Sequence, residues 1–389
     1  MVVDILCLST TDWDEIWGSR QQIMQRLADI GHRILFVERQ VSPEQILRNP
    51  AILRRKKFSL TQIKNLEQIQ ENIWLFNPPL VPPGRYYSHT LNEFGQRKIA
   101  QSLTQPISIL GFKDYILWIY PPQSSPIIPA IKPKMVVYHC IDRFNAGQRG
   151  RKRVIIQQQE NQLLKSADCI FVNSKGLIGE FQKTTKIPIS LLPSGVNVSH
   201  FQRTDAVHPE LESIPHPRLG LSGTLDARVD SKLIELIALS RPNWHLIVLG
   251  DQRRGFQNSS KLKSIQNIHF LGKIPFQELP LWLNGCDVFL IPYVLNERTF
   301  YISPLKFYEY LAIGKPIVTV PLPEISDFSS ICRQAASPES FIQEIEAALT
   351  TNTCHDTNVR RQTAQLHSWE SRITTILSVI NQRLKQIDA

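Results

Sequence analysis

Several patterns that mark membrane, secreted and metal-binding proteins are absent from the sequence. No apolar run approaches the roughly 18 residues that a membrane-spanning helix needs, and Asp4 interrupts the first apolar run, so we expect no secretory signal. The six cysteines are scattered without a C-x-x-C pair, which favours buried, reduced thiols over disulfides or zinc. No acidic or His-rich cluster has the spacing of metal ligands, and we expect neither a metal nor another cofactor. Together these absences predict a cytoplasmic protein.

Acidic residues are fewer than basic ones: the sequence has 34 Asp and Glu and 44 Lys and Arg, which gives a formal net charge of +10. The local basic clusters, residues 54–57 and 149–153, lack the interleaved aromatic residues of a nucleic-acid platform, so no nucleic acid partner is expected. Anionic lipid headgroups are the better candidates. Peripheral contact with the inner face of the membrane is therefore one interpretation, and a solvated charged face is the other.

The 389 residues are enough for two domains, each with its own core. Residues 2–9, 20–30 and 32–37 read as strand, helix and strand, which predicts an α/β fold with a parallel sheet. The loop between them has no G-x-G-x-x-G, which argues against a dinucleotide-binding dehydrogenase. Residues 42–72 then interrupt the alternation. This insertion either touches an acceptor or a membrane surface, or is a surface excursion.

The stretch SPLKFYEYLAIGKPIVTV, which begins at Ser303, predicts a core helix followed by a buried strand. Ser303 and Pro304 suit the N-cap and the first helical position, and Gly314 suits the end of the helix. The helix is apolar except for Lys306 and Glu309, one turn apart. Either these two form an ion pair on an exposed stripe, or Lys306 neutralises a phosphate at the helix N-terminus while Glu309 accepts hydrogen bonds from a sugar diol.

The segment PLKFYEYLAIGKPIV resembles the donor-site signature of GT-B glycosyltransferases, in particular glycosyltransferase family 4 and the group 1 enzymes of polysaccharide biosynthesis. In that family the corresponding helix binds the nucleotide half of a sugar nucleotide. The resemblance implies two Rossmann-like domains whose parallel sheets face a central cleft. It also implies the following division: an acceptor-side domain at 1–201 that includes the insertion at 42–72, a linker at 202–217, a donor domain at 218–368, and a helix at 369–389 that returns to the first domain with Trp369 as its anchor.

In the donor domain the resemblance implies that Lys306 and Arg228 stabilise the departing pyrophosphate. The donor-binding residues that it implies are Gly223, Thr224, Asp251, Lys273, Ile274, Ser303, Pro304, Leu305 and Glu309. Two departures from the family pattern are visible. Asp230 stands near the position where relatives carry a second phosphate-binding cation, and Tyr301 replaces the first acid of Glu-x7-Glu, for which Glu297 is a substitute from the preceding loop.

In the first domain the loop at 10–18 and the helix start that follows resemble the Trp-Asp loop of bacterial polysaccharide glycosyltransferases. The acceptor-side residues implied are Asp12, Trp13, Trp17, Arg20 and His139. The alternative for the two tryptophans is a packing role. The strand at 135–140 ends near Asp142, which keeps the second acid of the family's Tyr-Asp-x-x-Asp and is expected to bind a sugar hydroxyl or manage the acceptor proton. His139 replaces the first acid, and a core histidine is its other interpretation.

The predicted function is therefore transfer of a sugar from a nucleotide-diphosphate sugar to a hydroxyl of a lipid-linked or saccharide acceptor, with retention implied by the resemblance. No pair of carboxylates has a readable spacing that marks a hydrolase. Two alternatives stay open. One is a sugar-nucleotide epimerase or hydrolase, and the other is a non-catalytic GT-B subunit that binds a nucleotide.

Overall fold

The computed structural model describes residues 2–15, 17–52, 65–253 and 255–389. By its internal contacts the chain forms two units. Unit 1 comprises residues 1–193 and 373–389, and unit 2 comprises residues 194–372, so unit 2 is an insertion in unit 1. The division falls before the boundary expected at 201, and the expected linker at 202–217 belongs to unit 2, where it buries Leu211 and Ile214.

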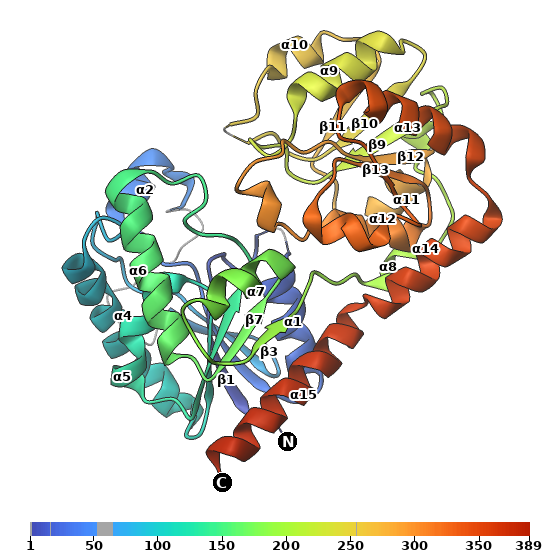
Figure 1. Ribbon diagram of the computed structural model, residues 1–389. Helices are drawn as coiled ribbons and strands as arrows, with labels where there is room; N and C mark the ends of the chain where they lie inside the picture. Colours follow the sequence, from blue (N-terminus) through green and yellow to red (C-terminus); the bar gives the residue numbers. More distant parts are fainter. Residues whose placement is uncertain (1, 16, 53–64, 254) are drawn as a thin grey trace. The chain divides into compact units, whose positions relative to one another are not determined.

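Unit 1 is built on a sheet which, within the described residues, has eight strands in the order β3-β4-β2-β1-β5-β6-β7-β8 (Figure 1). Neighbouring strands are parallel except for the antiparallel pair β3–β4. The central strands are apolar on both faces, as a sheet covered by helices on both sides requires. The strands are β1 (Asp4–Leu8), β2 (Arg33–Val37), β3 (Leu66–Gln70), β4 (Ile73–Phe76), β5 (Ile116–Ile119), β6 (Met135–Cys140), β7 (Cys169–Val172) and β8 (Ile189–Leu191).

Helices cover both faces of this sheet, with α4 and α6 on one side and α1 and α15 on the other (Figure 1). The last helix, α15 (Trp369–Ile387), starts in unit 2 and belongs to unit 1 from Ile373 onward. The other helices of unit 1 are α1 (Ser19–Asp29), α2 (Pro43–Arg48), α4 (His89–Leu110), the 3-10 helix η2 (Pro122–Ile127), α5 (Ile128–Ile131), α6 (Gly150–Ser166) and α7 (Lys175–Gln182).

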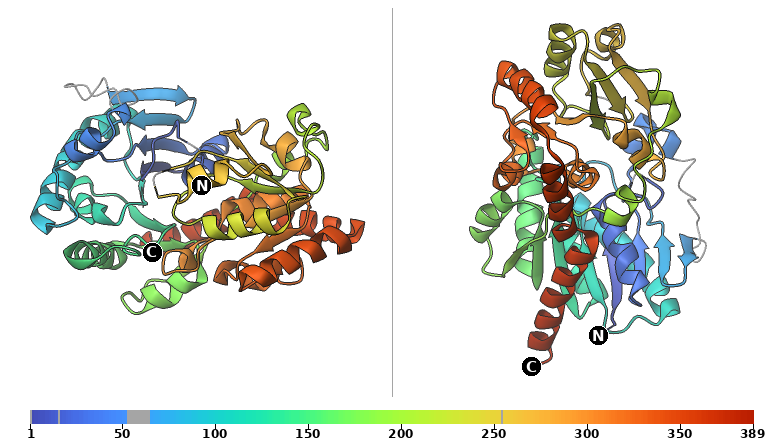
Figure 2. Two further views of the ribbon diagram at one scale, coloured as in Figure 1. Left: turned by 90° about the horizontal axis from the view of Figure 1, so that it is seen from above. Right: turned by 90° about the vertical axis from the view of Figure 1, so that its right-hand side faces the viewer.

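Unit 2 contains a second sheet, which in the described part of the chain has six parallel strands in the order β11-β10-β9-β12-β13-β14, again between two layers of helices (Figure 2). Its strands are β9 (Arg218–Ser222), β10 (His245–Leu249), β11 (Ile268–Gly272), β12 (Val288–Ile291), β13 (Ile317–Thr319) and β14 (Arg333–Gln334). Its helices are α8 (Val198–Phe201), η3 (Pro209–Leu211), α9 (Ser231–Ser240), α10 (Ser259–Lys263), α11 (Leu279–Asn284), η4 (Thr299–Tyr301), α12 (Leu305–Ile313), η5 (Pro323–Phe328), α13 (Pro338–Thr351) and α14 (Cys354–Leu366).

The two points at which the chain enters and leaves unit 2 lie side by side. The Val196 N–H donates to the His367 carbonyl oxygen over 3.1 Å, and the Trp369 N–H donates to the Val196 carbonyl oxygen over 3.1 Å. Arg372 Nη2 donates to the Ser194 carbonyl oxygen over 3.3 Å. The buried Trp369 ring packs directly on Gly195, where an added Cβ would lie 2.8 Å from it. The expected anchor of the returning helix is therefore fixed within unit 2.

Candidate nucleotide-sugar site

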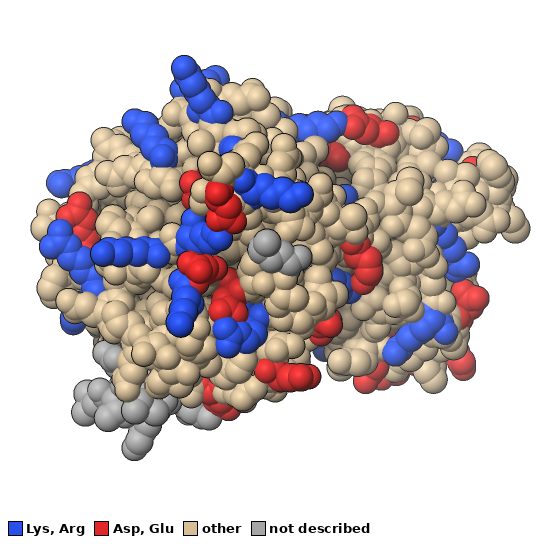
Figure 3. Space-filling model, turned by 90° about the horizontal axis from the view of Figure 1, so that it is seen from below, with Lys and Arg blue, Asp and Glu red and all other residues tan. Residues whose placement is uncertain are grey.

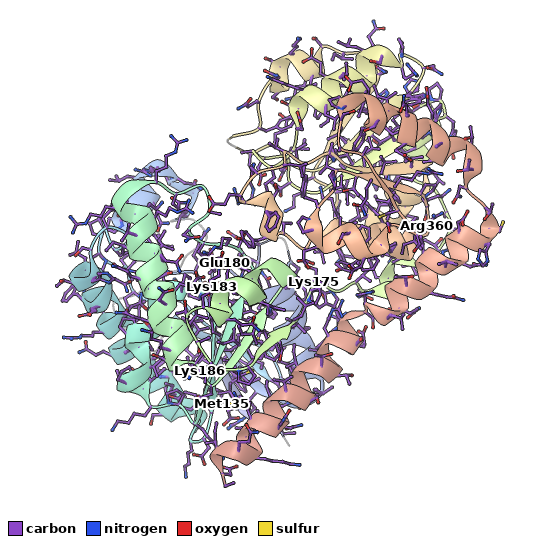
Figure 4. All side chains as sticks on the ribbon, in the orientation of Figure 1. Met135, Lys175, Glu180, Lys183, Lys186 and Arg360 are labelled. Atoms are coloured by element: carbon purple, nitrogen blue, oxygen red, sulfur yellow. The ribbon has the colours of Figure 1, made fainter. Side chains whose placement is uncertain are left out.

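Helix α12 is one residue shorter at its start than the sequence predicts. Its N-cap is Pro304 and its first residue is Leu305, so the assignment of Ser303 as the N-cap is wrong. The Ser303 hydroxyl is engaged elsewhere: it accepts a hydrogen bond from the Ser194 N–H over 3.2 Å. The predicted C-terminus is confirmed, because Gly314 adopts a φ of 91° and accepts a hydrogen bond from Arg360 Nε over 2.9 Å. Figure 4 labels Arg360 on α14.

Lys306, in the first turn of α12, is buried, and among the described residues its ammonium has no hydrogen-bond partner. Only 8% of the residue is exposed, and Nζ makes no hydrogen bond with any described residue. It lies over the Tyr293 ring, 5.4 Å from the ring centre. Among the described residues no ion pair within 4.0 Å joins it to Glu309, so the interpretation of these two charges as a mutual surface pair does not hold. A buried, unpaired cation favours an anionic ligand.

Glu309 is half-buried one turn further along α12. Burial raises the pKa of its carboxyl from 4.5 to about 7, and the nearby charge of Lys306 lowers it only in part. The carboxyl therefore changes its charge near neutral pH. As a carboxylate it accepts hydrogen bonds from hydroxyl groups, whereas its protonated form is also a donor.

Two glycines form a backbone surface beside Lys306. Gly223 follows β9 with a φ of +93°, and a Cβ on it would lie 3.4 Å from Lys306 Nζ. Gly250 follows β10 with a φ of +154°, and a Cβ on it would lie 2.0 Å from the Gly223 carbonyl oxygen. Only residues without a side chain allow this approach. The result is an exposed run of backbone at the carboxyl ends of two parallel strands, where open α/β sheets bind their ligands.

The position of α12 against this backbone is set by Tyr310. Its hydroxyl accepts a hydrogen bond from the Ser222 N–H over 2.8 Å, at the end of β9. Its ring stacks on Phe289 of β12, with ring centres 4.1 Å apart and an interplanar angle of 10°. Burial of the apolar side of the helix thus fixes Lys306 beside Gly223.

The remaining donor residues predicted from the sequence differ in burial and in their contacts. Thr224 is half-buried in the loop after β9, and that loop pairs with the segment after β10 because the Leu225 N–H donates to the Asp251 carbonyl oxygen over 3.0 Å. Asp251 and Lys273 are exposed and Ile274 is half-buried. Among the described residues no hydrogen bond or ion pair connects Lys273 or Ile274 to the other predicted donor residues.

Arg228, the second predicted phosphate-binding cation, is held by a carboxylate of its own loop. Its Nε and Nη2 each donate to an Asp226 carboxylate oxygen over 2.8 Å. Asp230, in place of the expected second cation, is the N-cap of α9 and accepts from the Lys232 N–H over 3.0 Å. This loop therefore offers one cation whose charge is already partly compensated.

In unit 1 some of the predicted acceptor residues hold the loop at 10–18 in place, and another is accessible to solvent. Asp12 is buried and accepts hydrogen bonds from the Arg39 N–H over 3.2 Å and from Arg39 Nη2 over 3.0 Å. Trp13 is buried edge-on against Phe36, with ring centres 5.0 Å apart. Trp17 packs edge-on against Trp13 and remains 37% exposed. Asp12 and Trp13 thus hold the loop in place, whereas Trp17 is accessible.

Arg20 and His139 both lie against the ring of Tyr120. The Arg20 guanidinium stands 5.5 Å from the Tyr120 ring centre, and the rings of Tyr120 and His139 are 5.0 Å apart. Burial, with a contribution from the charge of Arg20, lowers the pKa of His139 to about 3, so this imidazole is neutral. Its Nδ1 has no protein partner among the described residues. Asp142, two residues beyond β6, is half-buried.

Sequence reasoning missed Tyr120 and the amide of Asn173 as candidates. Both directly follow a strand, β5 and β7 respectively, and their position at strand ends was the available signal. The Tyr120 hydroxyl and Asn173 Oδ1 are buried without a hydrogen-bond partner among the described residues. Ser174 stands at the N-cap of α7 but forms no side-chain capping bond.

A cavity of about 460 Å³ lies at the opposite edge of the unit 1 sheet, beside the start of β1. Of its lining residues, Arg33 pairs with Asp4 over 2.5 Å, and Lys134 pairs over 2.8 Å with Asp388, which directly follows the C-terminal end of α15. The described residues contain no group of three or more His, Cys, Asp and Glu able to hold a metal ion. They also contain no helix long and apolar enough to cross a membrane.

Residues 217–351 match the family model Glycosyl transferases group 1. This segment is similar to the group 1 glycosyltransferases. It includes the strands and helices that hold Gly223, Gly250, Lys306 and Glu309. A relative from Bacillus subtilis (strain 168), the teichuronic acid biosynthesis glycosyltransferase TuaH, is 26% identical over 262 residues, which cover 62% of this chain and 66% of TuaH, slightly less than two thirds of its length. The predicted resemblance to group 1 glycosyltransferases is thereby confirmed.

Comparison with solved structures shows that the chain has the GT-B fold. Sucrose-phosphate synthase from Thermosynechococcus elongatus superposes with a TM-score of 0.75 at 14% identity, over 98% of both chains. HepE from Anabaena in complex with UDP and glucose superposes with a TM-score of 0.67 at 12% identity, over 97% of this chain and 99% of HepE. The predicted fold class, an α/β protein with two parallel-sheet domains of GT-B type, is confirmed.

Proposed function

We propose that this protein transfers a sugar from a nucleotide-diphosphate sugar to a hydroxyl of a saccharide or lipid-linked acceptor during polysaccharide biosynthesis. One observation carries the proposal: the buried, unpaired ammonium of Lys306 beside the bare backbone of Gly223, within a segment similar to the group 1 glycosyltransferases. Diphosphate esters need a cation and N–H donors in such a place. HepE, which is bound to UDP and glucose, and TuaH, which is named for teichuronic acid biosynthesis, support the substrate classes.

In the proposed reaction the bond between the anomeric carbon and the diphosphate oxygen breaks, and a bond from that carbon to the acceptor oxygen forms. With retention, the acceptor proton passes to the departing phosphate oxygen on the same face of the sugar. Lys306 stabilises the charge that develops on the diphosphate, and Arg228 adds to it if Asp226 releases its guanidinium. Glu309 accepts hydrogen bonds from the ribose hydroxyls, and Asp142 accepts one from an acceptor or donor hydroxyl.

The test measures release of nucleoside diphosphate from UDP-, GDP-, ADP- and dTDP-sugars, with and without saccharide and lipid-linked acceptors. Acceptor-dependent release supports transfer. Release without an acceptor supports the hydrolase alternative, and tight nucleotide binding without release supports a non-catalytic subunit.

The matched variants for this test are Lys306→Met and Lys232→Met. The first should lower nucleotide affinity by about tenfold or more, since a charge-assisted hydrogen bond is lost. The second removes an exposed lysine of α9 and should change nothing. Equal affinities of the two variants would contradict the role of Lys306.

A peripheral membrane contact of unit 1 at the cytoplasmic face remains a separate proposal. Near the starts of α4 and α6, Tyr87, Phe94 and Val154 are each more than half exposed, close to the basic residues 149–153. The His89–Gln158 hydrogen bond of 2.7 Å joins these two helices. The other basic cluster, 54–57, lies outside the described residues, and on the face seen in Figure 3 basic and acidic side chains are interspersed. Co-sedimentation of the protein with phosphatidylglycerol vesicles should therefore depend on the exposed Phe94 side chain as well as on the charge of the basic residues 149–153.

A further inference from the structure

Unit 1 contains a group of buried polar atoms that no protein group satisfies. The strand register places Tyr120 level with His139, because Ile119 pairs with Tyr138, and it places His139 opposite Phe171. Asn173 follows Phe171 by two residues, so Tyr120, His139 and Asn173 lie on one face of the sheet at its carboxyl edge. The first turn of α1 brings Arg20 onto the same face, over the Tyr120 ring.

Each of these side chains leaves one polar atom without a hydrogen-bond partner among the described residues. The atoms are Arg20 Nε, the Tyr120 hydroxyl, His139 Nδ1 and Asn173 Oδ1. Tyr120, His139 and Asn173 are 0%, 1% and 7% exposed. Leaving a buried polar atom unpaired is destabilising, so native proteins rarely keep several such atoms together without a use for them.

The charge of this group, which we call the Arg20 cluster, is positive. Arg20 forms no ion pair with any described residue. Glu15 contributes to its electrostatic environment but pairs with Arg39 at 3.3 Å, and Asp142 acts on it only from beyond ion-pair distance. Burial lowers the pKa of Arg20, while the charges of Asp142 and Glu15 act in the opposite direction. The other members are neutral, since burial raises the pKa of Tyr120 and lowers that of His139.

We infer that the Arg20 cluster binds an acidic substituent of the acceptor, either a carboxylate or a phosphate. Arg20 is the counter-ion, the Tyr120 hydroxyl donates to the same oxyanion, and Asn173 Oδ1 accepts from a neighbouring sugar hydroxyl. Asn173 is held for this role because its Nδ2 donates to the Ile141 carbonyl oxygen over 2.6 Å. The inference rests on the proposed function only in taking the acidic group to be part of the acceptor.

Binding of small probes to the whole protein without a donor tests this inference independently of transfer. The probes are methyl glucuronide, inorganic phosphate and the neutral methyl glucoside, followed by calorimetry. The variants are Arg20→Gln and Tyr120→Phe, and the control is Arg26→Gln on the same helix. Lys306→Met in unit 2 is measured as well, because it identifies any phosphate that binds at Lys306 instead. Thermal unfolding confirms that each variant is folded.

We expect Arg20→Gln to weaken binding of at least one acidic probe about tenfold or more and Tyr120→Phe to weaken it by a smaller factor. Binding of the glucoside, and binding of all probes by Arg26→Gln, should be unaffected. A carboxylate-only or phosphate-only response identifies which acidic group the acceptor carries. If no acidic probe binds, if Lys306→Met rather than Arg20→Gln removes binding, or if Tyr120→Phe is silent while Arg20→Gln unfolds the protein, the inference is wrong. If the acidic probes bind as expected but the protein transfers no sugar, the proposed function is contradicted and the inference about the Arg20 cluster is not.

Discussion

Among single residues, Glu309 links the donor site to pH. The pKa of its carboxyl is about 7. As the pH rises through neutrality, a larger fraction of the carboxyl is therefore ionised, and the ionised form can only accept hydrogen bonds. We expect nucleoside diphosphate affinity to increase several-fold between about pH 6 and pH 8, and Glu309→Gln to abolish this dependence. Titration calorimetry at each pH measures it. An unchanged slope in the variant would show that another group controls binding.

The same carboxyl predicts a pH dependence of stability. Its folded pKa is raised from 4.5 to about 7, so between these values the folded protein holds a proton that the unfolded chain has lost. The free energy of unfolding contributed by this group is therefore present below about pH 4.5 and is lost as the pH rises to about 7, by an amount on the order of 1–3 kcal/mol. Urea unfolding of the wild type and Glu309→Gln at pH 5 and pH 8 should show a smaller difference in the variant.

At the scale of secondary-structure elements, α6 and α7 are joined by a buried arginine. Arg143 contacts Glu160 of α6 over 3.1 Å and Glu180 of α7 over 2.9 Å, and the Tyr138 hydroxyl also donates to Glu160 over 2.8 Å. Figure 4 labels Glu180 on α7. Arg143→Met leaves the fully buried Glu160 carboxyl uncompensated and should lower the free energy of unfolding by about 3–5 kcal/mol.

Arg149→Met is the matched control for this change, because Arg149 is exposed and makes no side-chain capping bond at the start of α6. Its effect should stay within about 0.5 kcal/mol. Similar losses in the two variants, measured by urea unfolding, would contradict the structural role of the Arg143 contacts.

The turns after β9 and β10 depend on the absence of a side chain at Gly250. A methyl group there would collide with the Gly223 carbonyl oxygen at 2.0 Å, so Gly250→Ala should displace Gly223 from Lys306 and weaken nucleotide binding by about tenfold or more. Gly272→Ala tests the conformational strain alone, since φ is +72° and no atom lies within 4 Å of the added Cβ. Binding assays in which both variants behave alike would argue against the close approach.

Elements with strong local signals were predictable, and contacts between distant segments were not. The apolar run and Gly314 predicted α12 to within one residue, whereas the bond from Ser194 that removes Ser303 from the N-cap depends on a residue far away in the chain. The sequence left two positions open for Lys306, an exposed stripe or a ligand site, and the structure shows that the residue is buried. The placement of Tyr120 and Asn173 in one group was not predictable, because it depends on the order of the parallel strands in the sheet. Local sequence pattern does not specify that order.

For the molecule as a whole, unit 2 has what an independently folding part requires. The buried residues of its core all lie between Val196 and Ala364, and its first and last residues, Ser194 and Arg372, are hydrogen-bonded to each other. Residues 194–372 expressed alone should therefore unfold cooperatively and bind the nucleoside diphosphate with an affinity within about threefold of the full chain. Calorimetry of this fragment and of its Lys306→Met variant measures both, and a fragment without a thermal transition would contradict the prediction.

The adjacency of Ser194 and Arg372 also bears on how such genes can recombine. Pro193 and Ile373, the residues on the other side of the two connections, must be neighbours in space as well. Two crossover points in the gene are then enough to replace one unit 2 by another, and unit 1 keeps its ends at the same separation. Under the proposed function, nucleotide-sugar preference and acceptor preference would be inherited separately.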